Sequence, residues 1–112
     1  YTYNATTSLT LRALARQAAN FIVEADFAIA DKAGRRLFTG VSAADSASAK
    51  LRPQLVALHR RFFADELAED SPEIDESLAL FQAALKARPG DIKRAWKTTL
   101  SALLQDVRIA FY

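Results

Sequence analysis

The chain has 112 residues, of which 51% are hydrophobic and 25% are charged. This length and composition fit one globular domain with a core of its own and exclude an intrinsically disordered chain. Fifteen Lys and Arg residues against 13 Asp and Glu residues leave a formal net charge of only +2, which disfavours nucleic acid as a partner. There is no cysteine, so disulfides, thiolate nucleophiles and cysteine-ligated metals are excluded.

The N-terminal segment 1–7 is rich in Tyr and Thr, which favour extended backbone, and we expect an extended arm there. The chain begins at Tyr1 and contains no Met, so it is either processed at its N-terminus or a piece of a longer protein. An extracytoplasmic location is expected only if Tyr1 is a native processed terminus. No apolar run approaches the roughly 20 residues that span a bilayer, so we expect no transmembrane segment.

Residues 8–25 have the periodicity of an amphipathic helix. Apolar side chains recur at steps of three and four and should form one buried face, while Arg12, Arg16 and Asn20 lie opposite. The predicted buried face consists of Leu11, Leu14, Ala15, Ala18, Phe21, Ile22 and Ala25.

Residues 26–41 allow two structures. Segments 27–30 and 35–38 could pair as a hairpin across a turn that ends at Gly34. The same residues could instead form a short helix that is capped by Asp26 and ended by Gly34. The alanines favour a short helix followed by an irregular turn, and the hairpin remains the alternative.

Residues 42–50 are small and polar. Ser42 and Asp45 have the spacing of a capping box, which predicts a helical lead-in, and otherwise the segment is a loop. Pro53 suits the first turn of a helix, and we expect that helix over 53–67.

Residues 72–87 form the next predicted helix, because Pro72 suits a first helical position and acidic residues follow it. The last predicted helix, 91–111, has the broadest apolar face and carries Trp96, the only tryptophan. A face this wide should pack against two neighbouring helices, so we expect this helix to lie centrally.

These patterns predict an all-α fold. We expect a single helical domain over 1–112, built as a compact antiparallel bundle of about four main helices, because short connections favour antiparallel neighbours. The main helices are 8–25, 53–67, 72–87 and 91–111.

His59 is the only histidine, and it projects between two apolar stripes of its predicted helix. We expect partial burial, which should lower its pKa. It is either a core histidine with one hydrogen-bonded nitrogen, or a general base or lone ligand in a pocket. One histidine cannot complete a histidine metal set, and we expect neither a metal nor a cofactor. Trp96 is either part of a pocket or, as is commoner for an aromatic on a helix stripe, part of the core. The candidate pocket consists of His59, Phe62, Phe63 and Trp96.

Seven of the 12 residues from Asp65 to Glu76 are acidic. This run has no glycine and no EF-hand spacing, so it does not predict a calcium site. A pair of glycosidase carboxylates would need a facing cleft. The run is either a solvated corner whose carboxylates favour the next helix N-terminus, or a docking patch for a basic partner. With the adjacent basic pairs, the candidate interaction surface comprises Arg60, Arg61, Asp65, Glu66, Glu69, Asp70, Lys93 and Arg94.

The sequence contains no GxGxxG, P-loop, GxSxG or HExxH motif, and we assign no catalytic residue. We expect a non-enzymatic helical interaction or assembly domain, in which segregated acidic and basic surfaces bind a protein partner or a second copy. Exposed charge pairs set orientation and association rate, so salt should weaken such binding. The first alternative is a small-molecule or cofactor-binding bundle with its pocket near His59 and Trp96. The second is an enzyme that uses His59 with a carboxylate.

Overall fold

The computed structural model describes the backbone of residues 5–110 and the side chains of residues 9–106. This part of the chain contains four α-helices and one 3₁₀ helix. In chain order they are α1 (Ala5–Phe27), η1 (Lys32–Gly34), α2 (Ser48–Phe63), α3 (Pro72–Ala87) and α4 (Ile92–Ala110). No strand occurs among these residues. The all-α prediction is therefore confirmed.

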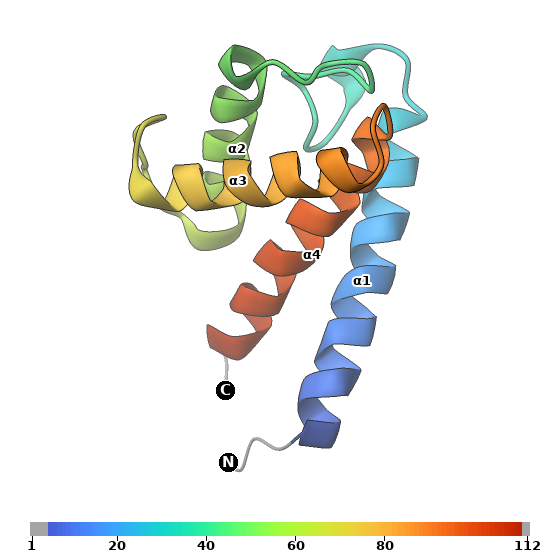
Figure 1. The fold of residues 1–112 in the computed structure, drawn as a ribbon, viewed down its shortest axis with the longest axis vertical. Coiled ribbons are helices and arrows are strands. Elements are labelled where there is room, and N and C mark those ends of the chain that lie inside the picture. Colours follow the sequence, from blue (N-terminus) through green and yellow to red (C-terminus); the bar gives the residue numbers. More distant parts are fainter. Residues whose placement is uncertain (1–4, 111–112) are drawn as a thin grey trace.

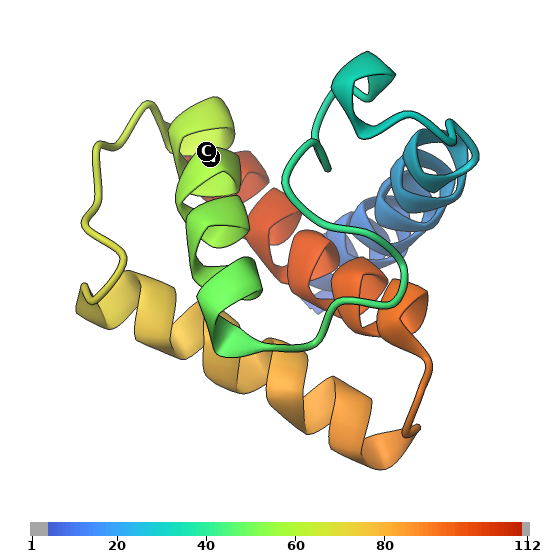
Figure 2. The same cartoon turned by 90° about the horizontal axis from the view of Figure 1, so that it is seen from above.

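The central helix is α4. It packs against α1, α2 and α3, one neighbour more than its apolar face predicted. Helices α1 and α4 run in opposite directions, and α3 lies across them at a steep angle (Figure 1). The long connection between α1 and α2 covers one end of the helices (Figure 2). Among the described helices, α1 approaches only α4, so α1 has a single helical neighbour.

Trp96 forms the centre of the core. Its side chain is fully buried, and its ring lies edge-on against Phe38 at 5.1 Å and Phe81 at 4.7 Å between ring centroids. Phe38 also stacks on Phe27 at 4.8 Å. This aromatic cluster joins α1, α3, α4 and the long connection.

No helix in the described part of the chain is long and apolar enough to cross a membrane.

The buried face of α1 differs from the predicted one. Leu14 and Phe21, which the periodicity predicted to be buried, are 42% and 73% exposed. The apolar arc of α1 is wider than a single neighbouring helix can cover, and the smaller residues make the contact with α4. The buried residues of α1 are Leu11, Ala15, Ala19, Val23, Asp26 and Phe27.

Helix α1 also begins earlier than predicted. It starts at Ala5, so Ala5, Thr6 and Thr7 are helical rather than part of an extended arm. Extending an existing helix adds one backbone hydrogen bond for each residue fixed, and this outweighs the weak helix propensity of Thr. The rest of the predicted arm, residues 1–4, lies outside the described residues.

The connection over residues 28–47 contains no hairpin, and its only helical part is η1. Asp31, not Asp26, caps η1 by accepting a hydrogen bond from the Ala33 N–H at 3.1 Å. The Ser42 N–H donates to the Asp45 carboxylate at 2.7 Å, but the chain leaves this turn in irregular backbone. Residues 42–47 are therefore the loop that the sequence allowed as the second choice.

Asp26 holds this connection to the end of α1. Its buried carboxylate accepts hydrogen bonds from the backbone N–H groups of Arg36 at 2.8 Å, Leu37 at 3.2 Å and Phe38 at 2.7 Å. A strand partner would have satisfied such groups in a hairpin, and here one side chain does so. The connection can therefore insert Phe38 into the core without regular secondary structure.

Two further polar side chains bind the backbone of the connection. The guanidinium of Arg35 donates to the carbonyl groups of Ile29 and Val41, each at 2.8 Å. On α2, the buried Gln54 accepts a hydrogen bond from the Gly40 N–H at 3.0 Å. The connection is thus fixed to α2 as well as to α1.

Helix α2 is displaced from its predicted range of 53–67, beginning at Ser48 and ending at Phe63. Pro53 therefore lies in the second turn, not the first, and it lacks the N–H that would bond the carbonyl of Ala49. Ala49 is exposed, so water can satisfy that carbonyl. The helix ends where Ala64 adopts a left-handed conformation, with φ of 56°, and donates its N–H to the Arg60 carbonyl at 2.9 Å.

The last two helices lie close to their predicted ranges. Helix α3 spans the predicted residues 72–87 and has Pro72 in its first turn. Helix α4 begins at Ile92, one residue after the predicted start, and is described as far as Ala110. The end of the predicted range, Phe111, lies outside the described residues.

Replacing Asp26 with Ala should strongly destabilise the fold, because three backbone N–H groups lose their acceptor. We expect the free energy of unfolding to fall by about 3 kcal/mol or more, measured by urea denaturation. The matched control is Asp31→Ala, which removes one exposed cap and should cost about 1 kcal/mol. If both variants lost the same small amount, Asp26 would not be holding the connection.

Candidate functional site

His59 lines a hollow between α2, α3 and α4. The hollow has a volume of about 290 Å³, and its wall includes four carboxylates as well as His59. The acidic residues of its wall are Asp65, Glu73, Glu76 and Asp106. None of these four was predicted to share a site with His59, because they belong to the α2–α3 loop, α3 and α4 and meet His59 only through tertiary packing.

The His59 side chain is buried, with 7% of its surface exposed. Its Nε2 lies 2.9 Å from the Ser77 hydroxyl oxygen, and its ring lies 5.6 Å from the ring of Phe63. Burial lowers the pKa of His59, and the negative charges of three nearby carboxylates oppose that effect. These contacts are those of a core histidine with one hydrogen-bonded nitrogen.

The hollow does not assemble a chelating or catalytic set. In the described part of the chain, no group of three or more His, Cys, Asp or Glu residues could hold a metal ion. His59 and Ser77 share a hydrogen bond, but among the described residues no carboxylate bonds the other ring nitrogen. A serine nucleophile needs a histidine that such a third group orients. The geometry therefore favours a structural role for His59.

The four residues of the candidate pocket do not line one cavity. Phe63 lies in the hollow with His59, whereas Phe62 lines a separate groove together with residues of α1 and of the connection after it. Trp96 is fully buried in the core, and its indole N–H has no hydrogen-bond partner among the described residues. Helical spacing placed these residues on apolar faces correctly, but it could not show which faces meet.

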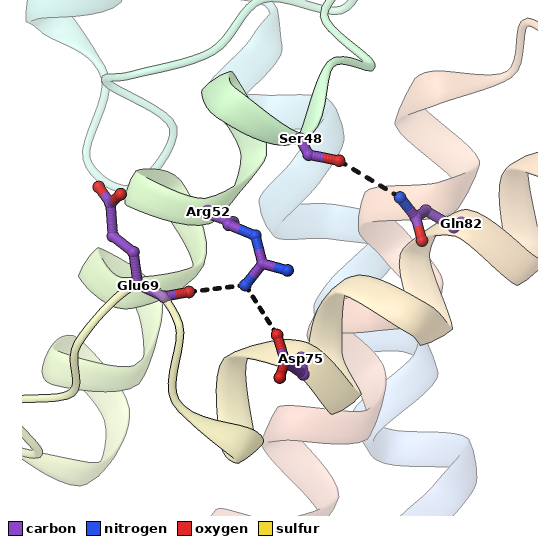
Figure 3. Close-up of polar contacts among 5 residues, drawn as sticks. All are labelled: Ser48, Arg52, Glu69, Asp75 and Gln82. Atoms are coloured by element: carbon purple, nitrogen blue, oxygen red, sulfur yellow. Dashed lines mark hydrogen bonds and ion pairs between the residues drawn. The ribbon is translucent and has the colours of Figure 1, made fainter.

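The acidic run forms the loop between α2 and α3 and the first turn of α3. Arg52 of α2 reaches this run, with its Nη1 at 2.8 Å from the Asp75 carboxylate and at 2.7 Å from the Glu69 carbonyl oxygen (Figure 3). A longer contact of 3.5 Å joins Gln82 to Ser48 (Figure 3). Within this run, the exposed acidic side chains without an ion pair in the described structure are Asp65, Glu66, Glu69, Asp70, Glu73 and Glu76.

The predicted interaction surface is not continuous. Lys93 and Arg94 begin α4, on the opposite side of the molecule from the α2–α3 loop in both views (Figures 1 and 2). Lys93 lies 3.5 Å from the Glu24 carboxylate, and Arg94 donates to the Ala84 carbonyl at 3.3 Å. These two residues therefore join helices within the molecule. Of the basic residues predicted for this surface, Arg60 and Arg61 are exposed on the last turn of α2, which leads into the acidic loop.

An apolar groove lies on one flank of α1. Its volume is about 490 Å³, and it is bounded by α1, the connection after α1, and the C-terminal turn of α2. Two exposed bases, Arg36 and Arg61, belong to its wall. Its one acidic residue, Asp26, is already bonded to three backbone N–H groups. The apolar residues of the wall are Phe21, Ile22, Ala25, Ile29, Leu37 and Phe62.

A polar groove lies on the other flank of α1. It has a volume of about 720 Å³ and runs between α1 and α4, with Leu80 of α3 in its wall. Asn20 lines this groove and Ala25 lines the apolar one, and five residues of helix separate them by about 140° around the α1 axis. The two grooves were not predicted, because they arise from α1 having a single helical neighbour.

Comparison of the chain with protein-family models, with curated proteins and with solved structures found no match. The function must therefore be inferred from the side chains that line these surfaces.

His59 should make stability depend on pH. Because the pKa of His59 in the folded chain is below its ordinary value of 6.5, the unfolded chain binds more protons than the folded chain at pH values near and below 6.5. Its contribution to the free energy of unfolding should therefore decrease as pH falls from about 7.5 to 5.5. Urea denaturation at both pH values measures this change, and His59→Gln should lack the histidine part of it. An unchanged difference between the two proteins at both pH values would contradict this assignment.

Proposed function

We propose that this chain is a helical protein-interaction domain and that the apolar groove beside α1 is its docking face. The main support for this proposal is that the Phe21 side chain is 73% exposed, although it lies on the helix that buries Ala15 and Ala19 completely. Burying a phenylalanine side chain stabilises a fold by roughly 1.5–3 kcal/mol. Here that apolar area stays outside the fold, where it can stabilise association instead.

The exposed apolar area extends beyond one residue. Leu14 lies seven residues before Phe21, so both project from the same side of α1, and Leu14 is 42% exposed. Ile29, at the other end of the groove, is 39% exposed. A stripe that continues from α1 into a groove suits a partner helix with an apolar face.

The rim of the groove indicates the charge of that partner. Arg36 and Arg61 are exposed, and neither has an acidic ion-pair partner within the described residues. We therefore infer a partner segment that is apolar on one face and acidic beside it. The apolar contacts would supply most of the affinity, and the arginines would set orientation and association rate. This proposal keeps Arg61 from the predicted charged surface and adds the apolar residues that periodicity had assigned to the core.

The test uses a synthetic amphipathic helix of about 18 residues, with leucines on one face and glutamates flanking them. We expect saturable binding to the full chain by fluorescence anisotropy, and weaker binding of the same peptide with lysines in place of glutamates. Phe21→Ser should weaken binding by about tenfold or more, as expected for an aromatic anchor. Leu9→Ser is the matched control, because Leu9 is 63% exposed on α1 but does not line the groove.

The arginine rim has its own matched pair. Arg61→Glu should weaken binding of the acidic peptide by about fivefold, whereas Arg60→Glu, at the adjacent exposed position outside the groove, should have a smaller effect. Equal binding of the acidic and basic peptides would refute the acidic partner. Light scattering must accompany the assay, since a dimer that Phe21→Ser dissociates would assign this face to a second copy instead.

A further inference from the structure

The polar groove between α1 and α4 is lined mainly by basic and uncharged polar side chains. Apart from Leu80 and Ala102, each of the described residues that line it is basic or carries an amide or a hydroxyl group, and none of them is acidic. The groove is concave and, at about 720 Å³, lies within the range of roughly 300–1,000 Å³ that small-molecule sites occupy. Such a lining supplies many hydrogen-bond donors and no competing carboxylate.

Three positive charges face this groove from two helices: Arg16 from α1, and Arg94 and Lys97 from α4. Arg16 is exposed and has no ion pair within the described structure. Arg94 donates from Nη1 to the Ala84 carbonyl at 3.3 Å, which leaves its other guanidinium N–H groups able to donate to a ligand. The positive charge is therefore only partly used by the fold.

Glu24 neutralises part of this charge from outside the groove. Its carboxylate lies 2.6 Å from Lys97 and 3.5 Å from Lys93, and the hydrogen bond from Lys97 is the main reason that the pKa of Glu24 is lowered. One carboxylate is thus shared by two lysines. Both arginines of the groove remain without a counterion in the described part of the chain, so the groove carries a net positive charge.

We propose that this groove is a binding site for a small phosphorylated ligand. A phosphate group presents three strong acceptor oxygens and about two negative charges, which can meet bases from both helices at once. A single carboxylate carries only one negative charge and so would not balance the charge of both arginines. The amides of Gln17 and Asn20 and the hydroxyls of Thr98 and Ser101 lie on either side to bond the rest of a polar molecule. This site is separate from the apolar groove and does not depend on the proposed docking function.

The experiment titrates the full ¹⁵N-labelled chain with sodium tripolyphosphate and follows amide chemical shifts. We expect saturable shifts at Asn20, Thr98 and Ser101, with a dissociation constant in the micromolar range. Arg16→Gln should weaken binding by about fivefold or more, since it removes one charge-assisted contact. Arg12→Gln is the control, because Arg12 is exposed one turn earlier on α1 and does not line the groove.

Two results would overturn the proposal. The first is an absence of saturable shifts at the groove up to about 10 mM ligand, which is weaker than a built site should be. The second is an equal loss of affinity in Arg12→Gln and Arg16→Gln, since a diffuse positive field would respond to either charge. Ser101→Phe offers a second check, because it fills the groove without removing a charge and should also abolish the shifts at Asn20.

Discussion

The carboxylate of Asp26 is the contact on which the connection between α1 and α2 depends. Residues 28–47 contain only one short 3₁₀ helix, so most of their backbone N–H groups have no regular partner. By bonding the N–H groups of residues 36–38, Asp26 lets Phe38 enter the core, where its ring meets Trp96. The same bonds place Arg36 and Leu37 in the wall of the apolar groove. One buried side chain therefore determines both the core and the proposed docking face.

The position of α1 follows from residue size. Ala15, Ala19 and Val23 are fully buried, and small side chains allow α1 to approach α4 closely. The ion pairs of Glu24 with the lysines of α4 are exposed to solvent, and such pairs contribute little to stability. Apolar packing with one neighbour therefore holds α1, and its two flanks stay open. The sequence gives those flanks different chemistry, with Phe21 on one side and Arg16 on the other.

Local patterns predicted the elements whose determinants are local. Pro72 and the helical period were sufficient for α3, and the apolar neighbours of His59 three and four positions away were sufficient for its burial. The connection could not be predicted in the same way, because Asp26 bonds residues ten to twelve positions later without any periodic signal. The predicted buried face of α1 was wrong, because its apolar arc is wider than one neighbouring helix can cover. The separation of Phe62 from His59 depends on how α2 meets the other helices, which its own sequence does not encode.

The distribution of charged side chains matters more to the functions that we propose than the net charge does. Arg52 and Lys93 pair with Asp75 and Glu24, so these bases stabilise contacts between helices. Arg16, Arg36 and Arg61 are among the bases that remain unpaired within the described residues, and these three line the grooves beside α1. A net charge of +2 conceals this arrangement, because unpaired acids gather on the α2–α3 loop instead. In the two functions that we propose, the unpaired bases of each groove would select an anionic ligand, and the apolar or polar wall would decide whether that anion belongs to a helix or to a small molecule.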